Sequence, residues 1–236
     1  MKKQFVLICV LLFMFSAFLQ AETVGDFDGD RKTDPLVWRR INEGIGFWEW
    51  HIYRSGSSSH QAVRWGINTA SGQTDLQALG DYDGDGKTDI AVWRTAFVSP
   101  PVQTYFYILR SSDATLQFAQ WGLSSDFQMS QDYDGDGITD IAVVRPSAQG
   151  RTWYMLQSRN GLQTVFLKSG GFPLRGDYDG DGRADFALAY SDGDLNWNFY
   201  IVHSRRKRAL FKQFGLGLAD YVVPGDYDGD RKTDIA

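Results

Sequence analysis

A chain of 236 residues with 43% hydrophobic and 15% aromatic residues can bury a sizeable core, which excludes an intrinsically disordered protein. The formal net charge of −5 argues against a nucleic-acid-binding protein. The only cysteine, Cys9, lies near the N-terminus, so disulfides cannot hold the rest of the chain together.

The N-terminus has the three parts of a secretory signal peptide. Lys2 and Lys3 precede an apolar run from Phe5 to Phe15, and small residues follow up to Ala21. We expect residues 1–21 to be removed and residues 22–236 to form an exported protein, either secreted, at the cell surface or in a periplasm. The alternative is an uncleaved membrane anchor, for which the apolar run is short. After cleavage we expect no membrane span.

Five Asp-rich segments repeat along residues 22–236. They begin at residues 26, 81, 132, 177 and 226, with an average spacing of 50 residues. This period is typical of β-propeller blades and is too long for leucine-rich or hexapeptide repeats. Each unit is therefore predicted to be one blade, with four full units and the start of a fifth. The ring would then be incomplete, or the chain a fragment.

Four short strands are predicted in each unit. The first, an apolar run expected to be a buried inner strand, covers residues 36–38, 90–93, 141–144 and 186–189. The second is rich in aromatic and branched residues and covers residues 48–53, 105–109, 153–156 and 197–202. The third ends near an aromatic–Gly pair such as Trp65-Gly66. A weaker fourth, such as residues 76–79 or 221–223, leads into the next Asp-rich segment.

The predicted fold class is all-β, a β-propeller built from four-stranded blades of about 50 residues. No amphipathic helix of useful length is indicated. An elongated β-solenoid or a string of small sandwiches is the alternative.

The Asp-rich segments have the ligand chemistry of a calcium loop. The pattern Asp-x-Asp-Gly-Asp-Gly-x-x-Asp puts carboxylates at positions one, three, five and nine and a backbone carbonyl at position seven, and calcium prefers such oxygen ligands. Of the 29 acidic residues, 20 lie in these loops, where their mutual repulsion calls for cations. The predicted ligands are Asp26, Asp28, Asp30, Asp34, Asp81, Asp83, Asp85, Asp89, Asp132, Asp134, Asp136, Asp140, Asp177, Asp179, Asp181, Asp185, Asp226, Asp228, Asp230 and Asp234.

Two other interpretations of these loops are weaker. An EF-hand needs a Glu at position twelve and a helix on each side, and neither is indicated here. Metal-free Asp–Gly turns would explain one copy, but five copies at one period argue against them. At position six the first and fifth loops carry Arg31 and Arg231 in place of Gly. A non-glycine residue with positive φ costs about 1 kcal/mol, so these two sites are predicted to be weaker or differently shaped.

The repeats resemble the FG-GAP or VCBS repeats of integrin-α-like propellers and of many bacterial exported proteins. The resemblance rests on Phe214-Gly215, Pro224-Gly225, the loop at 226–230 and residues 89–94, and it covers nearly all of residues 22–236. It implies a propeller that binds up to five structural Ca²⁺ ions, which staple successive blades together. It also implies a role in adhesion, with a carbohydrate or a cell-surface protein as partner. Propellers of this family commonly close with about seven blades, more than this chain supplies.

Catalytic residues are not indicated. His51, His60 and His203 lie on predicted strands or turns, without the spacing of a zinc or nucleophile site, so we expect no enzyme activity. The alternative is a propeller-scaffold lyase or hydrolase acting on a polysaccharide.

Tryptophans and a basic run are the remaining candidates for ligand contacts. Most of the eight tryptophans are predicted to pack in the core or between blades, and Trp48 and Trp50 are the best candidates for an exposed, sugar-stacking pair. Arg205 to Arg208 is predicted to be a solvated hairpin turn, the alternative being contact with an acidic polysaccharide or another cell-surface polyanion.

Overall fold

The computed structural model describes residues 25–41, 46–68, 75–95, 102–191, 196–217 and 219–236. In these residues 15 strands form four antiparallel sheets, and there is no α-helix, which confirms the all-β prediction. Accordingly, no helix in the described ranges could cross a membrane. The predicted signal peptide, residues 1–21, lies outside them.

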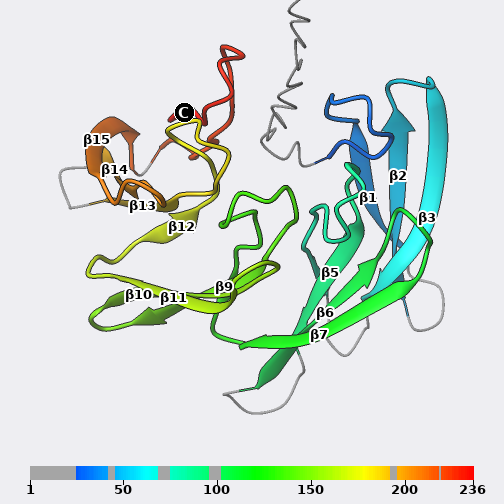
Figure 1. Ribbon diagram of the computed structural model, residues 1–236, viewed down its shortest axis with the longest axis horizontal. Coiled ribbons are helices and arrows are strands. Elements are labelled where there is room, and N and C mark those ends of the chain that lie inside the picture. Colours follow the sequence, from blue (N-terminus) through cyan, green and yellow to red (C-terminus); the bar gives the residue numbers. More distant parts are fainter. Residues whose placement is uncertain (1–24, 42–45, 69–74, 96–101, 192–195, 218) are drawn as a thin grey trace, which may run out of the picture.

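The four sheets follow one another in chain order round an open arc (Figure 1). The first contains β1 (Leu36–Ile41), β2 (Phe47–Arg54) and β3 (Ser59–Ile67). The second contains β4 (Asp75–Gln77), β5 (Ile90–Thr95), β6 (Gln103–Leu109) and β7 (Leu116–Leu123). The third contains β8 (Phe127–Gln128), β9 (Ile141–Ser147), β10 (Gly150–Gln157) and β11 (Gly161–Leu167). The fourth contains β12 (Phe172–Leu174), β13 (Phe186–Ser191), β14 (Asn196–Val202) and β15 (Ala209–Leu216).

The sheets are offset from the units that the sequence predicts. We expected the strand before each Asp loop to end one blade, but it pairs with the strand after the loop, as β4 does with β5. The reason is the loop itself, which folds back so that the Asp89 amide donates to the Gly80 carbonyl at 2.7 Å. The second, third and fourth Asp loops are therefore connections within one sheet, and the chain crosses to the next sheet after β3, β7 and β11.

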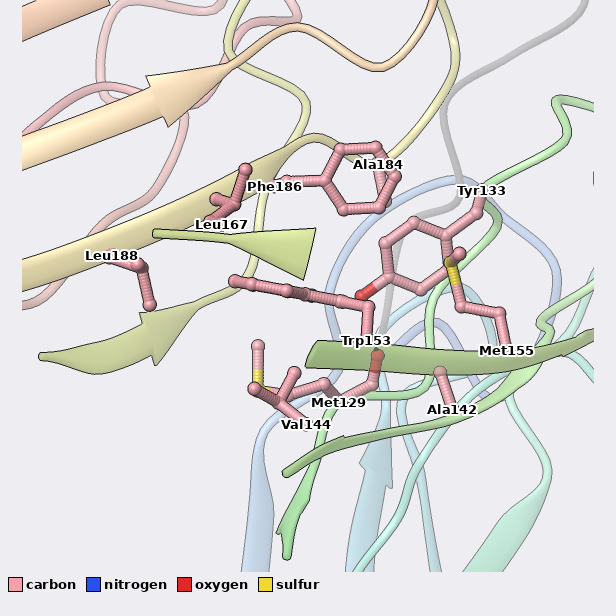
Figure 2. Close-up of a cluster of buried hydrophobic side chains, with 10 residues drawn as sticks. All are labelled: Met129, Tyr133, Ala142, Val144, Trp153, Met155, Leu167, Ala184, Phe186 and Leu188. Atoms are coloured by element: carbon pink, nitrogen blue, oxygen red, sulfur yellow. Dashed lines mark hydrogen bonds between the residues drawn. The ribbon is translucent and has the colours of Figure 1, made fainter. Parts of the chain in front are cut away.

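Each pair of neighbouring sheets encloses a hydrophobic core. Figure 2 shows the core between the third and fourth sheets, where Trp153 of β10 lies among side chains of both. Its ring meets Phe186 of β13 edge to face at 5.7 Å, and Tyr133 stacks on the same phenyl ring at 5.7 Å. Similar clusters lie between the first and second sheets and between the second and third. Sheet-on-sheet packing thus continues along the chain.

The tryptophans pack in the core or between sheets, as predicted. The prediction that Trp48 and Trp50 form an exposed pair is wrong. Trp50 is fully buried, and Trp48 stacks on Trp38 with ring centroids 3.7 Å apart. These rings are covered because β2 contributes to the core shared with the second sheet. Trp65 and Trp121 link neighbouring sheets, since their indole N–H groups donate to the Tyr107 and Tyr154 carbonyls at 3.2 and 3.1 Å.

Two strand predictions need correction. Residues 36–38, predicted as a buried inner strand, are only partly buried, with Val37 57% exposed. The reason is that β1 is an edge strand of its sheet, and that sheet is the first in the row. The equivalent strands β5, β9 and β13 are interior strands, and their first four residues are all buried. Residues 221–223, predicted as a strand, form none. The Val223 amide donates to the Ala236 carbonyl at 2.9 Å.

The Asp loops lie in a row on the inner side of the arc (Figure 1). Each is joined to its neighbour by the backbone: the Thr88 amide donates to the Asp26 carbonyl at 2.6 Å, and the Thr139 amide donates to the Asp81 carbonyl at 2.6 Å. The same bond joins the third loop to the fourth and the fourth to the fifth, at 2.7 Å in each case. The row therefore places all the predicted ligands along one line of the molecule.

Candidate metal centres

The first Asp of each loop closes the loop on itself. In the second loop the Gly84 and Gly86 amides donate to Asp81 Oδ1 and Oδ2 at 2.7 and 2.8 Å. The same pair of bonds recurs on Asp26, Asp132, Asp177 and Asp226. Because an ionised carboxylate offers about four acceptor sites, each of these groups keeps lone pairs for a cation.

The ninth residue ties the loop to a hairpin turn of the same sheet. Asp89 accepts from the Tyr82 amide at 2.8 Å through Oδ2 and from the Ser111 amide at 2.6 Å through Oδ1. Asp34, Asp140 and Asp185 make the equivalent pairs of bonds, with Ser55, Ser158 and Ser204 as the turn residues. These turns join the last two strands of each sheet, β2 to β3, β6 to β7, β10 to β11 and β14 to β15, so the loop and the turn form one unit.

The third and fifth residues face the same turn. Asp83 Oδ2 accepts from Ser112 Oγ at 2.6 Å, and Asp85 Oδ1 accepts from Ser111 Oγ at 2.9 Å. In the first loop Asp28 and Asp30 accept from Gly56 and Ser55, and in the third loop Asp134 and Asp136 accept from Asn160 and Ser158. Turn donors thus hold together carboxylates that would otherwise repel one another.

Several of these groups could hold a metal ion, because three ligand atoms in each lie within 4.8 Å of one another. Oxygen-only groups among the described residues include Asp26, Asp28 and Asp34; Asp81, Asp83 and Asp85; Asp132, Asp134 and Asp136; and Asp177, Asp179 and Asp181. A further group combines Asp179 and Asp185 with His203. In each of these groups the ligands come from one sheet. The neighbouring sheets are joined by the backbone bonds between loops and by the hydrophobic cores between the sheets. That bound ions staple successive blades stays a prediction.

The third and fourth loops contain buried oxygens that fit a cation. Asp134 Oδ1, both oxygens of Asp179 and Asp181 Oδ2 are buried without a hydrogen-bond partner among the described residues. Asp134 is only 1% exposed. A buried carboxylate oxygen without a partner is costly, and a bound cation would remove that cost.

The fifth loop has the same internal bonds but a different setting. Asp226, Asp228 and Asp230 are exposed, and Asp234 accepts from the Tyr227 amide at 2.9 Å. Lys232 forms an ion pair with Asp230. Among the described residues no hairpin turn covers this loop as Ser111 and Ser112 cover the second.

Arg31 and Arg231 adopt the left-handed backbone that the sequence predicts, with φ of 70° and 68°. Gly86 has nearly the same φ, 82°, and all three amides donate to the first Asp of their loop at 2.7–2.9 Å. The predicted difference in loop shape is therefore absent from the backbone. The strain of about 1 kcal/mol at each arginine remains.

Burial raises the pKa of the enclosed carboxyl groups. It raises the pKa of Asp140 to about 7 and that of Asp89 to about 6, even though the Ser158 and Ser111 amides lower them. Burial is also the main cause of the raised pKa of Asp81, Asp132, Asp177 and Asp185. Ionising these groups is thus less favourable than ionising an Asp in the unfolded chain, and a bound cation would offset the difference.

The metal-free protein should lose stability as the pH rises from about 5 to about 7.5. An Asp carboxyl has a pKa of 3.8 in the unfolded chain, so in this range the folded chain binds more protons at Asp89 and Asp140, with their pKa values of about 6 and about 7. The free energy of unfolding then falls as the pH rises through those values. Thermal melts in EDTA, followed by circular dichroism, measure the trend. Excess calcium should reverse it, and a metal-free protein that gains stability over this range would contradict the prediction.

The turn serines and the role of His203 were not predicted from the sequence. Ser55, Ser111, Ser158 and Ser204 each begin the turn before the last strand of their sheet, 18 to 22 residues beyond the ninth Asp of their loop. This repetition of serine is visible in the sequence and was the available signal. His203 precedes Ser204, and its Nδ1 lies 3.2 Å from Asp185 Oδ2. The other two histidines belong to none of these groups. His51 and His60 contact each other across β2 and β3, with their ring nitrogens 3.1 Å apart.

In comparisons with known proteins the chain matched no family model, no curated protein and no solved structure. The resemblance to FG-GAP and VCBS repeats therefore stays a prediction from the sequence.

Proposed function

We propose that this chain is an exported calcium-binding protein of the β-propeller, FG-GAP/VCBS-repeat type, in which calcium is structural. The four sheets are its blades, and the Asp loops are its calcium sites. The observation that carries the proposal is the buried, unpartnered carboxylate oxygens of Asp134, Asp179 and Asp181 within loops that repeat along the chain. Oxygen-only groups of this kind suit Ca²⁺ better than softer metals.

The proposed role is binding of an extracellular carbohydrate or cell-surface protein. Support comes from apolar side chains that are exposed along β7, β11 and β15, the last strands of the second, third and fourth sheets. Leu116 and Phe118 on β7 are 56% and 53% exposed, and Phe166 on β11 and Phe211 on β15 are also exposed. Exposed aromatic faces of this kind bind sugar rings and apolar protein surfaces.

The basic run supports the role less directly. Residues 205–208 form the exposed turn between β14 and β15, as predicted. Lys207 Nζ lies 5.4 Å from the centroid of the Phe186 ring, and Arg206 lies 4.0 Å from Asp179. The turn thus leans on its own sheet and Asp loop, which favours the solvated-hairpin interpretation over a polyanion site.

Calcium titration of the chelator-stripped protein, followed by calorimetry, tests the proposal. We expect several Ca²⁺ ions per chain with dissociation constants of about 10⁻⁴ to 10⁻³ M. Asp134→Asn should remove the third-loop site, whereas Asp113→Asn should not, because Asp113 lies in the β6–β7 turn, where it pairs with Thr115 and Arg110 and belongs to none of the Asp loops. The absence of binding heat together with calcium-free protein by elemental analysis would rule out the calcium sites.

A glycan array probed with and without calcium tests the proposed ligand. Calcium-dependent capture of a carbohydrate would support a binding module, with Phe118→Ala as a variant that should weaken it. A protein that binds calcium but neither glycans nor cell surfaces would retain the metal sites and lose the proposed role.

A further inference from the structure

His203 distinguishes the fourth Asp loop from the others. It follows β14 directly and precedes the turn residue Ser204. The same place in the first three sheets is taken by Arg54, Arg110 and Gln157. Of these four side chains only the imidazole offers a ring-nitrogen lone pair to a metal.

The imidazole points at two Asp carboxylates of its own sheet. His203 Nδ1 lies 3.2 Å from Asp185 Oδ2 and 3.7 Å from Asp179 Oδ2. The His203, Asp179 and Asp185 side chains are 11%, 10% and 0% exposed. Three ligand atoms from the loop and the turn thus meet in a largely buried space.

Asp179 provides the second, independent sign of a ligand. Its side chain is nine-tenths buried, and within the described part of the chain neither carboxylate oxygen has a hydrogen-bond partner. In the second loop the equivalent Asp83 is held by Ser112 and Arg110. Arg206 lies 4.0 Å from Asp179 Oδ2, but its side chain is 71% exposed, and such an exposed ion pair contributes little. A buried carboxylate of this kind requires a closer cation.

We propose that Asp179, Asp185 and His203 form a transition-metal site for which Zn²⁺ is the natural probe. Imidazole nitrogen with two carboxylates is a ligand set that zinc accepts, whereas calcium prefers oxygen ligands alone. Ligand atoms of a tetrahedral zinc site, with bonds of about 2.0–2.2 Å, lie about 3.3 Å apart, close to the 3.2 and 3.7 Å seen here. Water would supply the fourth ligand.

The site overlaps the calcium group of the same loop. Asp179 belongs both to this group and to the group with Asp177 and Asp181. The fourth loop therefore binds zinc or calcium, and the other loops bind calcium. This inference goes beyond the proposed function, since it assigns one loop of the row to a different ion.

Calorimetric titration of ZnCl₂ into the full chain in about 2 mM calcium tests the proposal. One zinc ion should bind per chain. His203→Gln, which copies Gln157 of the third sheet, should lower the zinc affinity at least tenfold and leave calcium binding by the other loops unchanged. Gln157→His should add a second zinc ion at the third loop.

His60→Gln is the matched control, because it removes a histidine of the exposed pair His51 and His60. It should leave zinc binding unchanged. Zinc binding that survives His203→Gln in a folded variant, or that disappears with His60→Gln, would overturn the site. Failure of the wild-type chain to bind zinc while it binds calcium would also overturn it, whereas zinc binding without any calcium binding would count against the proposed function alone.

Discussion

Chelation of calcium should lower the melting temperature of this protein by more than about 10 °C. At about 2 mM calcium, one site with a dissociation constant near 10⁻⁴ M adds about 1.8 kcal/mol to the free energy of unfolding. For a chain of this size that corresponds to about 4–7 °C per ion, and a chain with a single cysteine has no internal disulfide to compensate. Thermal melts with calcium and with excess EDTA measure the difference.

The third loop gives this prediction a control. Asp134→Asn removes the negative charge of the carboxylate whose Oδ1 is buried in that loop and leaves a weaker amide ligand, so the melting temperature of the variant should fall less on chelation than that of the wild type. Asp113→Asn, outside the loops, should lose as much as the wild type. Restoration of the melting temperature by calcium but not by magnesium would support a calcium site, and a melt unaffected by EDTA would contradict structural calcium.

Truncation of Trp153 should destabilise the protein by about 3–5 kcal/mol. Its side chain is fully buried between the third and fourth sheets and meets Phe186 edge to face (Figure 2). Trp153→Ala would leave a cavity that backbone strands on both sides cannot easily fill. Urea denaturation followed by circular dichroism measures the loss.

Leu156 supplies the comparison on the same strand, since it is 39% exposed. Leu156→Ala should cost well under half as much as Trp153→Ala. Equal losses for the two variants would mean that the sheets do not depend on the core between them.

Local sequence predicted most strands and the loop conformation, because both follow from neighbouring residues. The apolar runs at 90–93 and 186–189 became buried strands, and glycine or arginine at position six has the positive φ that the loop requires. Sheet boundaries could not be predicted in the same way. A repeat fixes the period of a structure but not where each unit starts, and pairing of β4 with β5 depends on how the loop closes.

The candidate metal groups, too, could be predicted only in part from local sequence. Spacing in the Asp-rich segments identified the carboxylates, but the turn residues that hold them lie 18 to 22 positions away and meet them only through strand pairing. His203 reaches Asp179 and Asp185 by that route. Burial of Trp50, and exposure of Val37, likewise depend on which sheet lies beside each strand.

The joint between successive Asp loops is built almost entirely from main-chain atoms. An amide at position eight meets a carbonyl at position one, while the side chain at position seven covers a glycine at position four of the loop before it: Lys87 over Gly29, Ile138 over Gly84, Arg183 over Gly135. Lysine, isoleucine and arginine all serve, so the joint accepts different side chains at the covering residue. A Cβ on the covered glycine would lie 2.9–3.3 Å from that side chain, at a φ of 72–83° that strains a non-glycine residue. Mutational damage should consequently spread to the adjacent sheet and fade beyond it, as in other linear arrays whose units interact only with their nearest neighbours.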